Sequence, residues 1–498
     1  MDRPRTRPRR TRVPVLPRRT VLLGTLAGAL AGALPLPEAA AAPREVLRQS
    51  SFPDPFTLGV ASGDPAPDGV VLWTRLAPQP DADDGLGGMP DRPVEVEWEI
   101  AEDEAFTRIV RRGTETATPE FAHSVHAEPA GLAPTREYFY RFRSGGHLSP
   151  AARTRTAPAP GAAVPALTVA AASCAKFGAG YFTAYRALAD DDPDLVLHLG
   201  DYFYESDEGD VRDPGGPEPT DLAGYRRRHA HQRSDADLRA AHAVAPWLVV
   251  WDDHELVNNW AGADRGRSPL RRRAAFQAYY EHMPLRRTSV PRGLDLQLYR
   301  RIPWGSLATF HMLDTRQYRD PRGSGGSITG DEQERWLLDG FRTSTAGWDV
   351  LGQQVFFAPR SGDGHKSDTW ESYPDSRERV LRGRLDSPVR NAVVLTGDEH
   401  VHHANELELD DRPAGTELVT TSITSGGDGD SGDDSGSGDD ENPHIRYRED
   451  RRGYLLTRFT PAELRADFRV VEQVSRPDAP VRTSATFVVP DGGALTRP

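Results

Sequence analysis

The stretch DLVLHLGDYFYE, residues 194–205, decides the fold of this chain because an apolar run leads directly into a glycine and a cluster of polar side chains. The run at 194–199 is typical of a buried strand. Asp201 and Tyr204 follow three residues apart, a spacing at which one turn can direct a carboxylate and a phenol at the same ion. Ligands of open α/β sheets bind outside the carboxyl ends of the strands, so we expect a site here.

Three further strand-like runs also end in polar side chains. They are 167–173 followed by Cys174, 247–251 followed by Asp252, Asp253, His254 and Glu255, and 392–396 followed by Asp398, His400, His402 and His403. We expect the four clusters to converge at one edge of the sheet. Carboxylates, imidazoles, a thiolate and a phenolate share a desolvated pocket only when something positive neutralises them, and metal ions are the usual solution. Taken singly, each cluster has a structural alternative, such as a helix N-cap or a core cysteine.

Short apolar runs alternate with helical patterns through the second part of the chain. Strands are predicted at 167–173, 194–199, 247–251, 306–313, 355–358, 392–396, 417–423, 454–459 and 464–470, and helices at 181–189, 271–280 and 331–341. This alternation predicts a layered α/β domain with a buried sheet over residues 167–498. Within it, the acidic Gly/Ser-rich run 426–441 is predicted as a flexible loop, because its spacing fits neither an EF-hand loop nor the glycine-rich calcium-binding nonapeptide.

The first part of the chain has a different pattern. Residues 43–157 alternate apolar and polar side chains between turn clusters, as at 94–100 and 138–142. This pattern predicts an all-β sandwich of immunoglobulin or fibronectin type. The Ala/Pro-rich segment 158–166 is predicted as the linker between the two domains.

The N-terminus is typical of an export signal. Eight arginines between Arg3 and Arg19 precede an apolar segment and an alanine run that ends at Ala42. The pair Arg18-Arg19 followed by TVLL resembles the twin-arginine signal, so residues 1–42 are predicted as a signal peptide. The protein is therefore expected to be secreted, with the twin-arginine translocation machinery as a partner. An anchor helix is the alternative, although the apolar segment is short and broken by Gly and Pro.

Composition excludes several other classes of protein. The 498 residues carry 61 Lys and Arg against 74 Asp and Glu, a net charge of -13, so no nucleic-acid-binding module is expected. Cys174 is the only cysteine, which rules out an intramolecular disulfide. Any phosphate-bearing substrate must be held by local cations.

Several short motifs in one order give the chain a family resemblance. They are GVASGDP (59–65), ASC (172–174), GDYFY (200–204), WDDHE (251–255) with NN (258–259), LDTRQYR (313–319) and TGDEH (396–400). With these motifs the chain resembles the PhoD-like alkaline phosphatases and phosphodiesterases, a family of calcineurin-like metallophosphoesterases related to the purple acid phosphatases. The resemblance covers nearly the whole mature chain. It implies a layered β-sandwich metallophosphoesterase domain flanked by helices, behind the N-terminal sandwich.

The resemblance also implies the metal ligands. They are Cys174, Asp201, Tyr204, Asp253, Asp398 and His400. Asp201 matches the carboxylate that bridges two metals, and Cys174 and Tyr204 match the ligands of a ferric ion. Asp253 and Asp398 stand where the wider superfamily has Asn and His, and these carboxylates favour Ca²⁺, as one or two ions. The ligand types agree, because thiolate, phenolate and imidazole suit Fe³⁺.

The predicted function is that of a secreted, metal-dependent hydrolase of phosphomonoesters or phosphodiesters that uses a metal-activated hydroxide. His254 is predicted to stabilise the transition state or protonate the leaving alkoxide, or else to donate a hydrogen bond to a metal-bound carboxylate. Arg316 is a candidate phosphate contact or a carboxylate partner. Two alternatives stay open: a phospholipase D with phospholipid as substrate, and a non-catalytic extracellular binding protein with structural metals.

Overall fold

The computed structural model describes residues 52–262, 268–321, 325–361, 368–429 and 442–498. The predicted signal peptide and residues 430–441 of the predicted flexible loop lie outside this part of the chain. The described residues all fall within one compact unit, Gln49–Pro498. None of the helices described is both long and apolar enough to cross a membrane.

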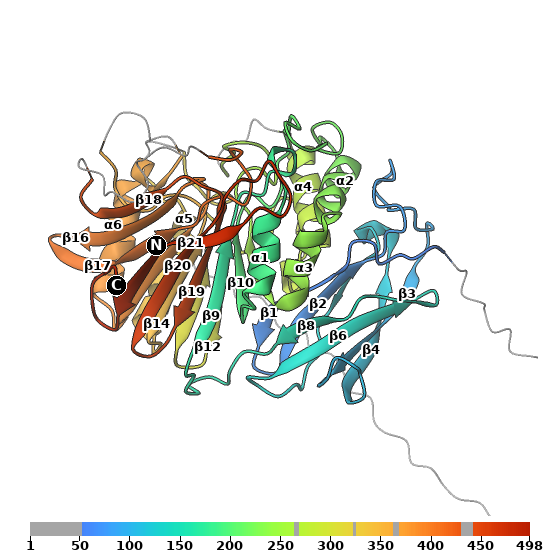
Figure 1. The fold of residues 1–498 in the computed structure, drawn as a ribbon, viewed down its shortest axis with the longest axis horizontal. Coiled ribbons are helices and arrows are strands. Elements are labelled where there is room, and N and C mark those ends of the chain that lie inside the picture. Colours follow the sequence, from blue (N-terminus) through green and yellow to red (C-terminus); the bar gives the residue numbers. More distant parts are fainter. Residues whose placement is uncertain (1–51, 263–267, 322–324, 362–367, 430–441) are drawn as a thin grey trace, which may run out of the picture. The chain divides into compact units, whose positions relative to one another are not determined.

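A nine-stranded mixed sheet carries three of the four predicted strand ends (Figure 1). Its strands are β1 (Val60–Ala66), β2 (Gly69–Arg75), β5 (Ser124–Ala127), β9 (Leu167–Ala172), β10 (Leu195–Leu199), β11 (Trp247–Val250), β19 (Gly453–Phe459), β20 (Glu463–Val471) and β21 (Val481–Pro490). Their order is β21-β20-β19-β9-β10-β11-β1-β2-β5. Because β9, β10 and β11 are parallel neighbours, their carboxyl ends lie at the same edge.

A seven-stranded sheet carries the fourth strand end. Its strands are β12 (Arg300–Trp304), β13 (Ala308–Met312), β14 (Trp348–Gln353), β15 (Asn391–Thr396), β16 (His402–Leu409), β17 (Arg412–Val419) and β18 (Ile445–Glu449), in the order β12-β13-β14-β15-β17-β16-β18. The two sheets pack face to face through one apolar core, in which Leu197 and Val250 of the first sheet join Phe310 and Val393 of the second. This packing explains why β10 is buried on both faces and reads as an uninterrupted apolar run apart from His198.

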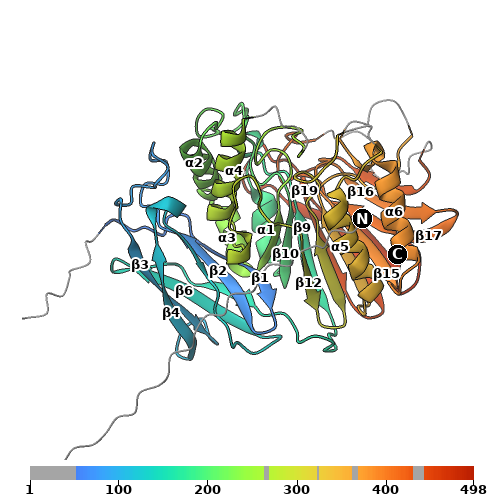
Figure 2. The ribbon, with the colours of Figure 1, turned by 180° about the vertical axis from the view of Figure 1, so that it is seen from behind.

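Helices cover the outer faces of both sheets. They are α1 (Thr183–Asp190), α2 (Leu222–Arg233), α3 (Ala236–Val244), α4 (Pro269–His282), α5 (Gly330–Thr343) and α6 (Pro374–Leu385). Helices α1 to α4 share a core with β9, β10 and β11, whereas α5 and α6 share one with β14, β15 and β17. Figure 2 shows α5 and α6 on the side of β15. The fold is therefore α/β, with two sheets between two groups of helices.

The N-terminal strands form a sandwich that shares a layer with the large sheet. A separate sheet of β3 (Val94–Ala101), β4 (Ile109–Ala117), β6 (Glu137–Ser144), β7 (His147–Leu148) and β8 (Ala152–Arg155) packs on β1, β2 and β5. However, β1 also pairs in parallel with β11, where Gly63 lies opposite Trp247. A Cβ at Gly63 would lie 2.4 Å from the Pro284 carbonyl oxygen, so glycine permits this close approach. An ion pair of 2.7 Å between Asp64 and Arg300 of β12 adds a second connection.

Two strand predictions are wrong in position. Residues 355–358 form no strand, and β14 lies earlier, at Trp348–Gln353. The apolar run is instead a buried loop, in which the N–H groups of Phe357 and Ala358 donate to the Glu417 carboxylate at 2.8 and 2.9 Å. The strand predicted at 417–423 is β17, which ends at Val419.

Candidate metal centre

The ends of β9, β10 and β15 turn sharply through residues in the left-handed conformation. Cys174, Asp201, Asp398 and His400 have φ values of 60°, 54°, 58° and 58°. Non-glycine residues with positive φ are uncommon, and such strain collects at functional sites where the surrounding structure enforces it. Here the N–H of Cys174 donates to the Gly200 carbonyl at 3.1 Å, which joins two of these turns.

The first group of candidate ligands contains sulfur, oxygen and nitrogen. Ligand atoms of Cys174, Asp201 and His400 all lie within 4.8 Å of one another. The Tyr204 phenol oxygen is 2.9 Å from Asp201 Oδ2 and 2.9 Å from His400 Nε2. These four side chains come from three separate strand ends, so the structure brings together the residues that the motifs single out.

The second group consists of carboxylates alone. Asp201, Asp252, Asp253 and Asp398 place one oxygen each within 4.8 Å of the others. Asp201 belongs to both groups, and also to a third with Asp253 and His254. Asp201 is therefore the shared side chain between two neighbouring positions where a cation could bind.

Arg316 balances part of this acidic cluster from behind. Its side chain is fully buried, and its Nε lies 2.5 Å from Asp252 Oδ1 and its Nη2 3.7 Å from Asp253 Oδ1. Asp368 pairs with Arg316 and, at 2.5 Å, with Arg319. Arg316 thus contacts carboxylates in this structure, and its guanidinium is shielded from solvent.

The protein alone does not neutralise the carboxylates. Burial, followed by the charges of Asp253 and Asp252, raises the pKa of Asp201 well above its usual range. Burial and the charge of Asp252 raise the pKa of Asp398 in the same way. Burial also lowers the pKa of His400 to about 3. Such groups become good ligands once a cation offsets their repulsion.

Two buried carboxylate oxygens test whether the cluster fits a cation. Within the described residues, Asp252 Oδ2 and Asp253 Oδ1 have no hydrogen-bond partner, although both side chains are at most 3% exposed. Buried carboxylate oxygens are normally hydrogen-bonded or bound to a metal. The donor set and these two atoms therefore fit metal ions.

His254 extends from the acidic cluster toward a cavity. Its Nδ1 lies 2.6 Å from Glu205 Oε2, and Glu205 Oε1 accepts a hydrogen bond of 2.7 Å from the Asn258 N–H. The backbone N–H of His254 lies 3.2 Å from Asp201 Oδ1. With Nδ1 bound to Glu205, Nε2 is the atom available to a group in the cavity.

The cavity has a volume of about 630 Å³ and includes Tyr204 and His254 in its wall. Its other lining side chains are mostly small or polar, among them Ser206, Ser425 and Lys176. A polar opening beside the ligand groups is where a small phosphoester could approach.

His402 and His403 lie on β16 and belong to none of the ligand groups found among the described residues. The two ring nitrogens of His402 lie 3.1 Å from the Thr421 N–H and 3.2 Å from the Arg469 carbonyl oxygen. His403 packs edge-on against Phe356. The contacts of both imidazoles are with the surrounding fold and not with the candidate ligand groups.

The sequence analysis did not assign Asp252 as a metal ligand, and it gave Glu255 no role in holding the ligand-bearing loops. Glu255 accepts hydrogen bonds from the N–H groups of Tyr202, at 2.6 Å, and Asp252, at 2.9 Å. It thereby joins the loops after β10 and β11. The D-x-x-E spacing of Asp252 and Glu255 could have predicted this contact, because in a capping box the glutamate side chain accepts a hydrogen bond from the N–H three residues earlier.

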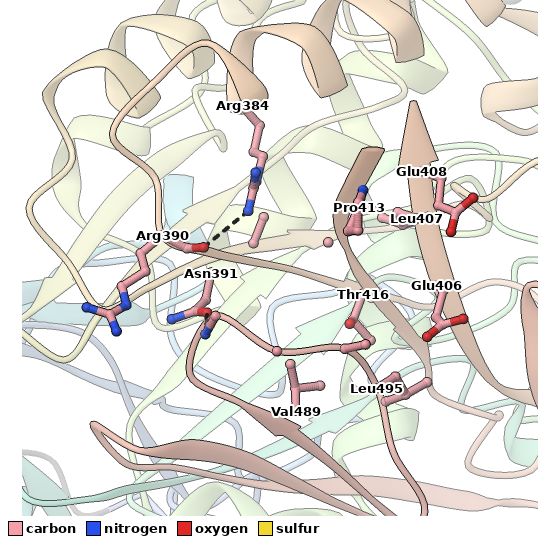
Figure 3. Close-up of a pocket in the computed structure, with 15 residues that line it drawn as sticks. Arg384, Arg390, Asn391, Glu406, Leu407, Glu408, Pro413, Thr416, Val489 and Leu495 are labelled. Carbon is pink, nitrogen blue, oxygen red and sulfur yellow. Dashed lines mark hydrogen bonds between the residues drawn. The ribbon is translucent and has the colours of Figure 1, made fainter. Parts of the chain in front are cut away.

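A second cavity lies at the opposite end of β15 from Asp398 (Figure 3). It measures about 200 Å³. Arg384 donates a hydrogen bond of 3.1 Å to the Arg390 carbonyl oxygen, and the Arg390 side chain is paired with Asp491. None of the ligand groups described above lines it.

The stacked sheets, the candidate ligand groups and the adjoining cavity form the arrangement expected of a metal-dependent hydrolase. The family model for the PhoD-like phosphatases matches residues 168–468, and that for their N-terminal domain matches residues 39–158. The chain therefore belongs to the PhoD-like phosphatases, and it is a phosphoester hydrolase, as its motifs predict.

Two individual proteins show the same relationship. Alkaline phosphatase D of Bacillus subtilis (strain 168) is 48% identical over 472 residues, which cover 87% of this chain and 80% of that protein. A solved structure described as the structure of PhoD superposes with a TM-score of 0.84 at 47% identity, over 89% of this chain and 92% of that one.

Proposed function

We propose that this protein is an alkaline phosphatase and phosphodiesterase whose ligand groups hold Fe³⁺ and one or two Ca²⁺ ions. The observation that carries the proposal is the position of Asp201, which is common to the sulfur-containing group and to the carboxylate group. One carboxylate between two cation positions is the arrangement expected where neighbouring ions act on one phosphate.

The donor types assign the ions to the two groups. Cys174, Asp201, Tyr204 and His400 would hold Fe³⁺, since thiolate, phenolate and imidazole suit that ion. Asp201, Asp252, Asp253 and Asp398 would hold Ca²⁺, which prefers carboxylate oxygens. When bound, the ions supply Lewis acidity that offsets charge on the phosphoryl oxygens and turns water into a nucleophile near neutral pH.

The side chains of the protein supply the remaining chemistry. Glu205 accepts a hydrogen bond from Nδ1 of His254 and so fixes the imidazole, and in the imidazolium form the second proton, on Nε2, can pass to the leaving alkoxide. Arg316 acts as a positioning residue, because it holds Asp252 and Asp253 and is buried away from solvent. These contacts support the carboxylate-partner role of Arg316 over its role as a phosphate contact.

Elemental analysis with a visible spectrum of the purified protein tests the metal assignment. We expect iron with a thiolate or phenolate charge-transfer band, together with calcium. Cys174→Ala and Asp201→Asn are expected to fold and to lose hydrolysis of an aryl phosphate, whereas Asp83→Asn, at a fully exposed carboxylate, keeps it. Full turnover in both site variants would contradict the assignment.

Neither alternative function gains support from the structure. Parallel assays on an aryl phosphate, a phosphodiester and phosphatidylcholine separate phosphatase from phospholipase D activity. The cavity wall is largely polar, which suits a water-soluble ester better than acyl chains. A non-catalytic binding protein would show no turnover on any of the three.

Two further proposals concern architecture and location. The two stacked sheets with outer helices support a metallophosphoesterase domain, and the strands before residue 158 support an immunoglobulin- or fibronectin-like sandwich. The motif Arg18-Arg19-TVLL supports secretion by the twin-arginine pathway. Replacing both arginines with lysine is expected to leave the enzyme inside the cell, as measured by activity in cell fractions.

A further inference from the structure

Lys176 is an unusual cation in this protein. Only two of its 61 Lys and Arg residues are lysines, Lys176 and Lys366. Lys176 lines the cavity beside the candidate metal centre. No carboxylate in the described part of the chain lies within 4.0 Å of its ammonium group, whereas Arg316, Arg360 and Arg452 near the same site are all in ion pairs.

The backbone of Lys176 is held in place while its ammonium group is left for the cavity. Its carbonyl oxygen accepts a hydrogen bond of 2.7 Å from Thr424 Oγ1. Lys176 directly precedes the short 3₁₀-helix η2 (Phe177–Ala179), and the N–H of Ala179 also donates a hydrogen bond to the Lys176 carbonyl oxygen. Nζ lies 6.0 Å from the centre of the Tyr204 ring, whose phenol faces the ligand groups.

Two carboxylates, Asp210 and Asp428, also line the cavity, and neither lies within 4.0 Å of the Lys176 ammonium group. The Asp428 carboxylate accepts hydrogen bonds from the N–H groups of Val474 and Ser475 and from the Ser475 hydroxyl, at 2.7 to 2.8 Å. Ser206 and Ser425 offer hydroxyls, and a Cβ on Gly427 would meet nothing within 4 Å. Among the described residues the wall is therefore polar, and Lys176 is the one lysine that lines it.

A cavity of about 630 Å³ has room for more than one phosphoryl group. The scissile phosphate belongs next to the carboxylate cluster, with which Lys176 makes no ion pair or hydrogen bond. An ammonium group set to one side of that cluster is placed to meet the alcohol part of the ester.

We propose that Lys176 binds a second anionic group on the leaving alcohol. The preferred substrates are then phosphomonoesters whose alcohol also carries a carboxylate or another phosphate. This inference rests on the proposed function and extends it, since it names the substrate class of the same site. Lys176 acts here as a residue that determines specificity.

Matched substrate pairs test the proposal on the metal-loaded enzyme. Glycerol 3-phosphate and 3-phosphoglycerate differ by a carboxylate, and fructose 6-phosphate and fructose 1,6-bisphosphate differ by a phosphate. In each pair, the ratio of kcat/KM for the doubly anionic ester to that for the simple ester is measured, because a ratio cancels differences in folding or metal content.

Lys176→Ala is expected to lower at least one of these ratios about tenfold or more, the scale of a hydrogen bond to a charged group. The pair that responds identifies the second anion as carboxylate or phosphate. Lys176→Arg is expected to keep most of the preference, and Ser206→Ala, on the same cavity wall, to leave both ratios unchanged.

Equal losses on both members of each pair would overturn the inference, because Lys176 would then bind the transferred phosphate. Unchanged ratios in Lys176→Ala would overturn it as well. In either case the wild-type enzyme still hydrolyses phosphoesters, so the proposed function stands. Failure of the metal-loaded wild type on every phosphoester would instead overturn both.

Discussion

Two clusters of buried charge in this protein are built in opposite ways. Between α2 and α4, Glu281 accepts hydrogen bonds of 2.7 and 2.6 Å from Arg226 and one of 2.9 Å from Gln277. At the ends of β10, β11 and β15, four carboxylates converge on one another, with Arg316 as their buried cationic partner. The first cluster is balanced by the protein itself, whereas the second leaves two carboxylate oxygens without a hydrogen bond from the described residues.

The balanced cluster stabilises the fold, whereas the unbalanced cluster is suited to binding metal. A buried ion pair with all its hydrogen bonds made holds two helices in register and needs nothing further. A carboxylate cluster with spare oxygens is unfavourable alone and favourable around a cation. Substitutions in the two clusters are therefore expected to affect different measurements.

The largest effect is expected at the metal centre. Asp201→Asn removes the charge shared by the ligand groups and is expected to lower kcat/KM on an aryl phosphate by about 10³-fold. Elemental analysis of the same sample is expected to show less bound metal. Full metal content together with wild-type turnover would contradict the shared-ligand assignment.

In the balanced cluster, Arg226→Met leaves the Glu281 carboxylate buried without its cation. The free energy of unfolding is expected to fall by about 3–5 kcal/mol, as measured by urea denaturation. Metal content per folded molecule stays unchanged. The double variant Arg226→Met/Glu281→Leu, which removes both charges, is expected to recover part of the lost stability. Loss of bound metal in Arg226→Met would contradict the separation of the two clusters.

A smaller effect is expected at Glu255, which joins the loops of the metal centre without being in a ligand group. Burial raises the pKa of Glu255 to about 8, although the N–H groups of Tyr202 and Asp252 oppose the rise. Glu255→Gln weakens these hydrogen bonds and is expected to lower metal affinity by about 10–100-fold. Added metal is expected to restore turnover. Glu218→Gln, at an exposed glutamate, serves as the control. An unchanged metal titration of Glu255→Gln would show that the hydrogen bonds of Glu255 are not needed for metal binding.

The smallest effect is expected on the stability of the protein at acidic pH, and it depends on His198, which lies outside both clusters. Burial lowers the pKa of His198 to about 3, next to Tyr185 and Trp247. The unfolded chain binds a proton near pH 6.5 where the folded chain does not, so the contribution of His198 to stability is present above pH 6.5 and is lost as the pH falls toward 3. Wild type is expected to lose about 1 kcal/mol more than His198→Gln between pH 6.5 and 5.5 in urea melts at fixed metal concentration. Parallel pH profiles would assign the acid sensitivity elsewhere.

The buried strands and the convergence of their ends were predictable from the sequence. Strands β9, β10 and β15 lie within one residue of their predicted limits, because strands covered on both faces are continuous apolar runs. Parallel strand ends must then meet at one edge, which brings Cys174, Asp201 and Asp398 together. The metal roles of these residues remain predictions.

The helix α2 and the backbone strain were not predictable by the same means. The sequence of α2, LAGYRRRHAHQR, has no apolar face, yet Arg226, Arg228, His229 and Arg233 are all buried in it. Their burial depends on partners far along the chain, such as Glu281, that no local pattern reveals. The left-handed turns, and the separation of more than 4.0 Å between the Lys176 ammonium group and every described carboxylate, are likewise properties of the folded chain alone.

The pairing of β1 with β11 has a consequence for any attempt to dissect this enzyme. The two family models meet between residues 158 and 168, but the hydrogen bonds of the sheet run across that boundary. A fragment beginning at residue 168 would expose the edge of β11 as a template for aggregation and would leave Arg300 without Asp64. The regions matched by the two family models thus share one sheet, so either could be exchanged for a relative's counterpart only if the new part kept the pairing between β1 and β11.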